Sequence, residues 1–424
     1  MANLDMSACK NADKWLNSSI DENIKAEIVR MREKNPDEFN DAFYKTLEFG
    51  TGGLRGVMGL GTNRMNLLTV SMTTQGFCNY IRLKNGEKAI SCVISHDSRN
   101  NSREFAFTTA RVMTANGFKV YMFEDLRPTP ELSFAVRELK ADAGVMITAS
   151  HNPKEYNGYK AYWNDGAQLT TPHDVEVIEQ VNKITDIAQV KIAKDDSGIT
   201  FLGKEMDKTY IDRVKSLSMN NGYIERHKDL KIVYTPLHGT GITVVPAALK
   251  AYGFENVFVE EHQAIPDGNF PTCLSPNPEN PEALEAGLRK AKEVDADILL
   301  ATDPDADREA IAVKTSSGEW VLFNGNQTAT LFTYYLLERW QQEHKLTGKQ
   351  FVIKTIVTSE MVRKVADSFN VHCYDTLTGF KHIAAKIKSL EGREEYIGGG
   401  EESFGYLIGD FVRDKDSVSG CCIL

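Results

Sequence analysis

Short apolar strands alternate with helices along this chain, and this alternation restricts its fold more than any other feature of the sequence. The first strands are predicted at 89–94, 118–123 and 144–147. The helices around them are predicted at 67–81, 102–116 and 128–139. Strands that alternate with helices at this spacing favour α/β domains with mostly parallel sheets.

The alternation falls into three units, which predicts three α/β domains. The first domain is predicted over residues 1–204 and begins with a helical arm at 6–48. Its last helix is predicted at 173–186, and the polar stretch 191–198 marks the boundary zone that follows. The second domain is predicted over 205–323 and the third over 324–424. A chain of 424 residues is long enough to form several hydrophobic cores.

A serine follows the strand at 144–147, on a predicted tight turn. The apolar run stops at Thr148, and Ser150 and His151 come next. In an open α/β sheet, ligands bind beyond the carboxyl ends of the strands. A serine exposed there acts as a nucleophile or carries a phosphoryl group, and Lys160 on the next strand faces it. The alternative is a Ser/Asn-Pro turn that only ends the strand.

Three aspartates follow another predicted strand, at Asp303, Asp305 and Asp307. Their spacing places the carboxylates on one side of an extended chain, where they repel one another unless a cation binds. All-oxygen ligands favour Mg²⁺, Mn²⁺ or Ca²⁺ over zinc. A calcium EF-hand is excluded, because Arg308 and Lys314 stand where its glycine and glutamate belong. Arg308 is suited to bind a phosphate that contacts the same metal. The alternative to a metal site is an acidic surface turn.

Two glycine-containing segments carry further polar groups. Residues 50–56 predict a loop whose N–H groups suit a phosphate together with Arg55, or else a flexible turn. Glu401 and Ser403 lie in the second segment, whose sequence nearly matches the Gly-x-Ser-x-Gly nucleophile motif of hydrolases. Glu401 replaces the first glycine, so a hydrolase triad is rejected. The segment suits sugar hydroxyls instead, and the alternative is a capped helix start.

Composition excludes several classes of protein. The chain has 49 basic and 59 acidic residues, a net charge of −10, and no long basic block. Nucleic acids and anionic membranes are therefore not expected partners. The seven cysteines form no Cys-x-x-Cys pair, and no secretory signal or membrane span is visible, which predicts a cytoplasmic protein. The sequence makes no prediction of the oligomeric state.

The segments Thr148–Pro153, Asp303–Arg308 and Glu401–Gly405 occur in an order and spacing that belong to a known family. From about Phe49 to Leu424 the sequence resembles the α-D-phosphohexomutases, the family of phosphoglucomutases and phosphomannomutases. The resemblance is to the longer branch, which includes phosphopentomutase-like members. It implies successive three-layer α/β domains with mixed, mostly parallel sheets around a central cleft. The family's fourth domain, which grips the non-transferred phosphate, is expected to be absent, because the chain stops in a predicted helix of the third.

The resemblance also implies a role for each matching residue. Ser150 is implied to carry a phosphoryl group in the resting enzyme, with Lys160 as general acid/base. The implied catalytic set is Ser150, His151, Lys160, Arg55 and Arg308. The implied metal ligands are Ser150, Asp303, Asp305 and Asp307. The implied contacts to the substrate are Glu401, Ser403, Lys381, Thr378 and Gly379.

The function implied by the resemblance is that of an isomerase, an intramolecular phosphotransferase. It moves a phosphoryl group between the 1 and 6 positions of a hexose phosphate through a phosphoserine and a bisphosphate intermediate. Glucose 1-phosphate is the expected substrate, with mannose phosphate as a second candidate. One Mg²⁺ per active site is the implied cofactor, and a sugar bisphosphate is the implied activator. The alternatives are a phosphopentomutase acting between the 1 and 5 positions, a phosphatase-like or inactive fragment, and a non-catalytic sugar-phosphate binder.

Overall fold

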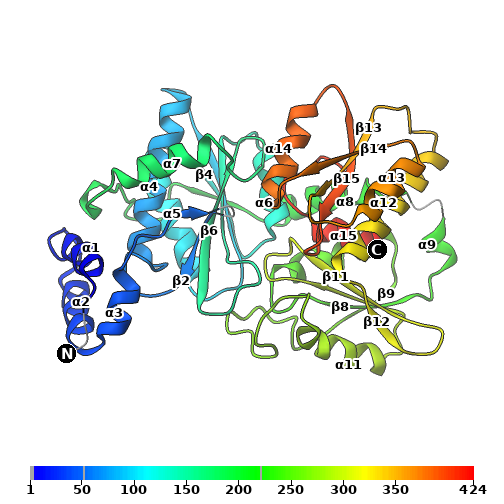
Figure 1. The fold of residues 1–424 in the computed structure, drawn as a ribbon, viewed down its shortest axis with the longest axis horizontal. Coiled ribbons are helices and arrows are strands. Elements are labelled where there is room, and N and C mark those ends of the chain that lie inside the picture. Colours follow the sequence, from blue (N-terminus) through cyan, green and yellow to red (C-terminus); the bar gives the residue numbers. More distant parts are fainter. Residues whose placement is uncertain (1–3, 51–52, 220–221) are drawn as a thin grey trace.

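Three β-sheets follow one another along the chain in the computed structural model, which describes residues 4–50, 53–219 and 222–424 (Figure 1). Helices flank each sheet, which confirms the predicted succession of α/β domains with mixed sheets. The domain boundaries drawn from the sequence remain predictions. None of the described helices is both long and apolar enough to cross a membrane.

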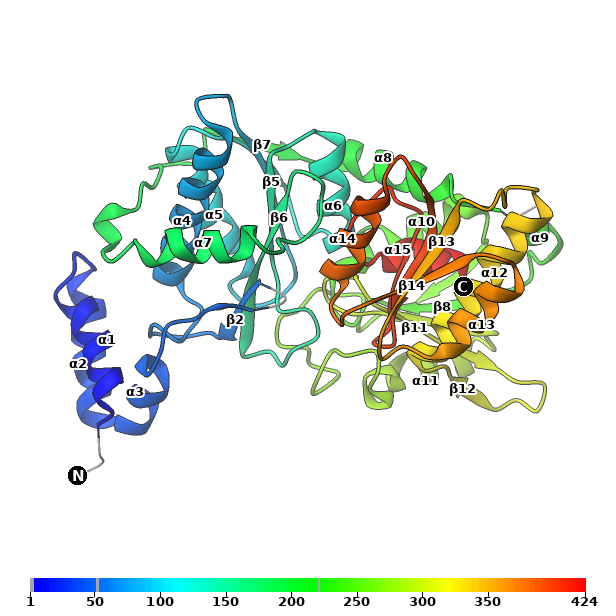
Figure 2. The ribbon, with the colours of Figure 1, turned by 45° about the horizontal axis from the view of Figure 1, so that its top comes forward.

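The N-terminal arm consists of three helices that stand apart from the sheets (Figure 2). They are α1 (Met6–Leu16), α2 (Glu22–Lys34) and α3 (Pro36–Phe43). The arm has a small core of its own, in which Trp15 meets Phe43 edge to face with ring centroids 5.7 Å apart. The predicted helical arm is thus present, broken into three helices.

The first sheet contains both parallel and antiparallel pairs. Among the described residues its strands lie in the order β1 (Phe49–Gly50), β2 (Gly53–Val57), β6 (Tyr156–Trp163), β5 (Ala143–Ile147), β3 (Ser91–His96), β4 (Lys119–Phe123) and β7 (Ile199–Leu202). Strand β3 is parallel to β4 and β5, whereas β6 is antiparallel to both β5 and β2. Polar residues that follow β3 and β5 therefore meet at one edge of the sheet.

Helices cover both faces of this sheet. They are α4 (Leu67–Asn85), α5 (Ser102–Ala115), α6 (Thr129–Glu138) and α7 (His173–Asn182), with a short 3₁₀ turn at Ile187–Gln189. Alternate residues of a strand face opposite sides. In β3, Cys92 and Ile94 pack in one core with α4 and α5, whereas Val93 packs in another with α6. The domain is thus a three-layer α/β structure.

Strand β2 corrects the loop predicted at 50–56. Leu54 to Val57 pair with β6, Gly53 pairs with Gly50 of β1, and Thr51 and Gly52 lie outside the described residues. The glycines allow neighbouring backbone segments to approach closely, because a Cβ at Gly53 or at Gly158 on β6 would lie 2.5 Å from a carbonyl oxygen. Arg55 is consequently held on a strand rather than on a flexible loop.

The second sheet carries the aspartates at the end of one of its strands. Its order is β12 (Trp320–Leu322), β11 (Glu309–Lys314), β10 (Ile298–Thr302), β8 (Lys231–Thr235) and β9 (Asn256–Val259). Its helices are α8 (Lys204–Lys215), α9 (Tyr223–Arg226), α10 (Val245–Tyr252) and α11 (Glu285–Glu293), with 3₁₀ turns at Thr240–Thr243 and Pro281–Leu284. Strands β11 and β12, which the sequence did not predict, add an antiparallel edge.

The third sheet has the order β14 (His372–Thr376), β13 (Gln350–Thr355), β15 (Glu395–Glu401) and β16 (Gly405–Ile408). Its helices are α12 (Gly325–Gln342), α13 (Glu360–Ser368), α14 (Phe380–Leu390) and α15 (Ser417–Ile423). One hydrophobic core joins this sheet to the second, since Tyr234 and Leu249 pack in the same cluster as Phe351, Ile383 and Val418. The second and third sheets accordingly lie together, at the right of Figure 1.

Truncation of Phe77 tests the packing of α4 on the first sheet. Phe77 is fully buried, so Phe77→Ala removes a ring from a packed core and is expected to lower the free energy of unfolding by about 3–5 kcal/mol. Leu83 on the same helix is 68% exposed, and Leu83→Ala is expected to change it by no more than about 0.5 kcal/mol. Urea denaturation measures both. Equal losses for the two variants would contradict this packing.

Candidate active site

Ser150 occupies a tight turn just beyond the end of β5. Its φ of 53° lies in the left-handed region, which costs a non-glycine residue about 1–2 kcal/mol. The Ser150 N–H donates a 2.8 Å hydrogen bond to the hydroxyl of Thr148, which helps to hold this conformation. The side chain is buried at the point where the first and second domains meet. The turn predicted from the sequence is therefore present and aims the serine at the second domain.

The Ser150 hydroxyl joins two of the predicted site residues. Its Oγ donates to Asp303 Oδ2 at 2.7 Å and lies 3.1 Å from His151 Nδ1. Burial lowers the pKa of His151 to about 3, and the nearby cation of Arg308 acts in the same direction. The imidazole is consequently neutral at pH 7 and has a hydrogen-bonding role next to the serine.

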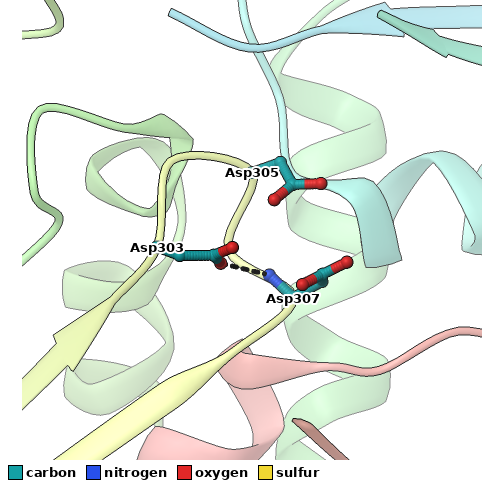
Figure 3. A group of neighbouring side chains, drawn as sticks. All are labelled: Asp303, Asp305 and Asp307. Atoms are coloured by element: carbon teal, nitrogen blue, oxygen red, sulfur yellow. Dashed lines mark hydrogen bonds between the residues drawn. The ribbon is translucent and has the colours of Figure 1, made fainter. Parts of the chain in front are cut away.

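The aspartate segment is a turn, which corrects the extended geometry expected from the sequence. The Asp303 N–H donates to the Arg308 carbonyl, 3.2 Å away, and Ala306 has a φ of 52°. Asp303 Oδ1 accepts from the N–H of Asp307 at 3.1 Å (Figure 3). It also accepts from the N–H of Arg308 at 3.1 Å. The turn still brings the three carboxylates together, because it folds the chain around Asp303.

Two lysines form ion pairs with these carboxylates, and a threonine donates a hydrogen bond to one of them. Lys160 Nζ on β6 lies 2.7 Å from Asp305 Oδ2 and 3.1 Å from Asp307 Oδ2. Lys415 Nζ, from the third domain, lies 3.1 Å from Asp307 Oδ2. The Thr129 hydroxyl, at the start of α6, donates to Asp305 Oδ2 at 2.7 Å. All three domains therefore contribute to one charged cluster.

The pKa values follow from burial and from this charge distribution. Burial and the neighbouring carboxylates of Asp305 and Asp307 raise the pKa of Asp303 well above its usual value. Burial acts in the same direction on Asp307, but Lys160 and Lys415 outweigh it and hold the pKa of Asp307 below its usual value. Burial would lower the pKa of Lys160, yet Asp305 and Asp307 raise it above its ordinary value. Lys160 thus keeps its proton at neutral pH.

The aspartates fit a divalent cation. One oxygen from each of Asp303, Asp305 and Asp307 lies within 4.8 Å of the others. Ligands on opposite sides of an ion bound at about 2.0–2.6 Å are about 4–5 Å apart. Asp305 Oδ1 and Asp307 Oδ1 are buried and accept no hydrogen bond from the part of the chain that the structure describes. This set of hard oxygen donors is suited to Mg²⁺ rather than to zinc.

The two predicted phosphate-binding arginines both lie close to His151 of the serine turn. Arg55 Nη1 on β2 donates to Asn152 Oδ1 at 2.9 Å. Arg308 Nη1 donates to Glu279 at 3.2 Å and to the Ser403 carbonyl at 2.9 Å. Arg308 therefore connects the aspartate turn with the segment predicted to bind sugar.

The predicted sugar-binding residues gather in the third domain, after β14 and β15. Glu401 Oε1 accepts the N–H of Gly379 at 2.9 Å, which links the two segments. Lys381 Nζ forms an ion pair with Asp174 of the first domain at 3.3 Å. Thr378 is exposed beside them. The structure thus joins these segments to each other and, through Arg308, to the aspartate turn.

Three family models match the chain in succession. They describe the phosphoglucomutase/phosphomannomutase α/β/α domains I, II and III, and they match residues 46–188, 208–318 and 324–424. The chain belongs to this family. It is therefore an isomerase-class enzyme, an intramolecular phosphotransferase of the phosphoglucomutase/phosphomannomutase type.

Curated relatives and solved structures agree with this membership. A phosphoglucomutase of Staphylococcus haemolyticus is 38% identical over 411 residues, 96% of this chain and 72% of that protein. One of Staphylococcus aureus is 38% identical over 413 residues, 97% of this chain and 73% of that protein. A phosphoglucomutase/phosphomannomutase family protein of Burkholderia thailandensis has the same fold, with a TM-score of 0.69 at 21% identity over 88% of this chain and 75% of that one. Parafusin of Paramecium, in an open form, has a TM-score of 0.69 at 17% identity over 89% of this chain and 70% of that one.

Several residues of this phosphohexomutase site were missed in the sequence. Asp97 and Arg99 follow β3, which neighbours β5, so the rule that led to Ser150 could have found them. Thr129 lies between two prolines at the start of α6 and gave no comparable signal. Lys415 precedes α15, and its contact with Asp307 depends on the docking of two domains, which no local pattern shows.

Removal of one carboxylate tests the mutase's metal site. Asp307→Asn is expected to weaken Mg²⁺ binding at least about tenfold, because it removes an ionised ligand from a buried triad. Asp295 is an exposed aspartate of the same domain that pairs with Lys314, and Asp295→Asn is expected to bind Mg²⁺ as the unmodified protein does. Isothermal titration calorimetry measures both affinities. Equal affinity in the two variants would contradict the assignment of the triad.

Proposed function

We propose that this enzyme interconverts the 1-phosphate and 6-phosphate of a hexose, with glucose 1-phosphate as the preferred substrate and mannose 1-phosphate as a second one. The single observation that carries the proposal is the 2.7 Å hydrogen bond between Ser150 Oγ and Asp303 Oδ2. It joins a serine on the first domain to a carboxylate cluster on the second. A phosphoryl group carried by that serine lies against the proposed metal ligands.

The proposed reaction has two phosphoryl transfers. In the first, the bond between phosphorus and Ser150 Oγ breaks, and a bond to the free hydroxyl of the sugar phosphate forms. Ser150 Oγ gains a proton from Lys160, which is protonated at rest, and Lys160 takes up the proton that the sugar hydroxyl loses. After the bisphosphate turns around, its other phosphoryl group passes to Ser150, which regenerates the phosphoserine.

Charge neutralisation and positioning are the main requirements of such a transfer. Arg55 and Arg308 are proposed to hold the phosphoryl oxygens, and His151 to orient the serine hydroxyl. One Mg²⁺ per site, held by Asp303, Asp305, Asp307 and an oxygen on Ser150, would supply further neutralisation when bound. A sugar bisphosphate is the proposed activator, because it can phosphorylate Ser150 before the first turnover.

The substrate is proposed to bind where the sugar segment meets the aspartate turn. Glu401 and Ser403 are proposed to accept hydrogen bonds from sugar hydroxyls, with Thr378, Gly379 and Lys381 close by. Two proteins of similar fold are N-acetylglucosamine-phosphate mutases, one in complex with its substrate and one, of Aspergillus fumigatus, in complex with GlcNAc-6P and magnesium. We propose a cytoplasmic location, which the seven free cysteines support.

Replacement of the serine tests the proposed nucleophile. Ser150→Ala is expected to reduce conversion of glucose 1-phosphate on the order of 10⁴-fold, because no hydroxyl remains to accept the phosphoryl group. The unmodified protein is expected to gain ~80 Da on Ser150 after exposure to glucose 1,6-bisphosphate, as shown by intact and peptide mass spectrometry. The exposed Ser389, whose hydroxyl donates to the Lys386 carbonyl, provides a control, and Ser389→Ala is expected to retain activity. Full activity of Ser150→Ala would disprove the phosphoserine relay.

A substrate panel tests the ring preference. Arg308 donates a hydrogen bond from the aspartate turn to the sugar segment, so the distance between the sugar contacts and the reacting phosphoryl group is fixed. A fixed distance favours sugars of one ring size. Glucose 1-phosphate is expected to react fastest, mannose 1-phosphate more slowly and ribose 1-phosphate slowest in coupled assays. A preference for ribose 1-phosphate would establish the phosphopentomutase alternative. Release of inorganic phosphate as the main reaction would establish the phosphatase alternative.

A further inference from the structure

The serine turn folds around a single buried guanidinium. The side chain of Arg99 is fully buried. Its Nη2 donates to the Ser150 carbonyl at 2.6 Å and also to the Asn152 carbonyl. Its Nη1 donates to the carbonyls of Pro153 at 2.9 Å and Tyr156 at 3.1 Å. One planar cation thus binds four carbonyl oxygens of the segment that carries the nucleophile.

Asp97 connects the same guanidinium to the peptide group on the N-terminal side of Ser150. Its Oδ2 lies 3.4 Å from Arg99 Nε and accepts the Thr148 hydroxyl at 2.6 Å. That hydroxyl in turn accepts the Ser150 N–H at 2.8 Å. The two peptide groups that flank the Ser150 Cα are therefore fixed, one through its N–H and one through its carbonyl. Together they set the backbone conformation from which Oγ points at Asp303.

The second domain closes over this arrangement. The ring of Phe270 lies under the Arg99 guanidinium, with its centroid 5.1 Å from the guanidinium carbon. Ser275, from the same stretch of chain, donates its hydroxyl to the His151 carbonyl at 3.2 Å. A guanidinium is suited to both contacts at once, because its plane stacks on an aromatic ring while its edges donate hydrogen bonds.

We propose that Arg99 is a positioning residue for phosphoryl transfer, acting with Asp97 to fix the place and direction of the Ser150 hydroxyl. The inference rests on the proposed function, since it assigns a role in the phosphoserine relay. In-line transfer depends on the position of the nucleophile, and a misplacement of about 1 Å costs about 100-fold in rate. A lysine at this position has neither the planar fork nor enough directed donors to hold four carbonyls.

The test compares Arg99→Lys and Arg99→Ala with the same changes at Arg339. Arg339 is also buried and donates to a backbone carbonyl, that of Met219 at 3.1 Å, but lies on α12 of the third domain. Arg99→Lys is expected to lower kcat about 100-fold with an unchanged KM for glucose 1-phosphate. Phosphorylation of Ser150 by glucose 1,6-bisphosphate, followed by intact mass, is expected to slow by the same factor. Guanidinium at a non-denaturing concentration is expected to restore part of the activity of Arg99→Ala and none of that lost in Arg339→Ala.

The outcomes separate this inference from the function on which it rests. If the unmodified protein neither turns over nor takes up phosphate on Ser150, the relay fails and the inference fails with it. If the unmodified protein does both and Arg99→Lys matches it, only the inference is overturned. The inference is also overturned if the activity of the Arg99 and Arg339 variants falls in the same proportion to their thermal stability and guanidinium restores none of it. If Arg99→Ala does not fold, the kcat and KM of Arg99→Lys and Asp97→Asn test the inference instead. Asp97→Asn is expected to lower kcat without changing KM.

Discussion

Three buried carboxylates within 4.8 Å of one another are the constraint on which the rest of the site depends. Burial and mutual repulsion oppose their ionisation, so such a cluster persists only with positive charge around it. Lys160 from the first domain, Arg308 from the second and Lys415 from the third supply that charge. The need to neutralise one acidic turn thus brings residues from all three domains to a single place.

The chemistry proposed for the site uses the same electrostatic balance. Each phosphoryl transfer moves negative charge between a serine and a sugar, and the cations that surround the aspartates are already oriented toward it. Preorganised charge of this kind costs no rearrangement during the reaction. The buried and neutral His151 adds a hydrogen-bonding group without adding to the net charge. The arrangement supports a reaction that runs in both directions with one set of residues.

The proximity of Ser150 to the aspartate turn could be predicted from the sequence because each follows an apolar strand. The edge of an α/β sheet is where such residues meet, and this general rule needs no knowledge of the final packing. Gly53 and Gly56 were misleading, since glycine is equally suited to a loop and to tightly paired strands. Lys415 could not be found, because its partner Asp307 is more than a hundred residues away and is reached only after two domains dock. The extended geometry expected around Asp305 was wrong, since hydrogen bonds to Asp303 fold that segment into a turn.

The hydrophobic core shared by the second and third sheets has a consequence for folding. Residues of β8 and α10 pack with residues of β13, α14 and α15 in one cluster, so neither sheet can lose its packing without exposing part of the other. A boundary drawn at residue 323 or 324 therefore separates two sheets but not two cooperative units. The first sheet has its own cores on both faces and reaches the shared cluster through Phe134 of α6, so it shares less apolar packing with the other two sheets than they share with each other.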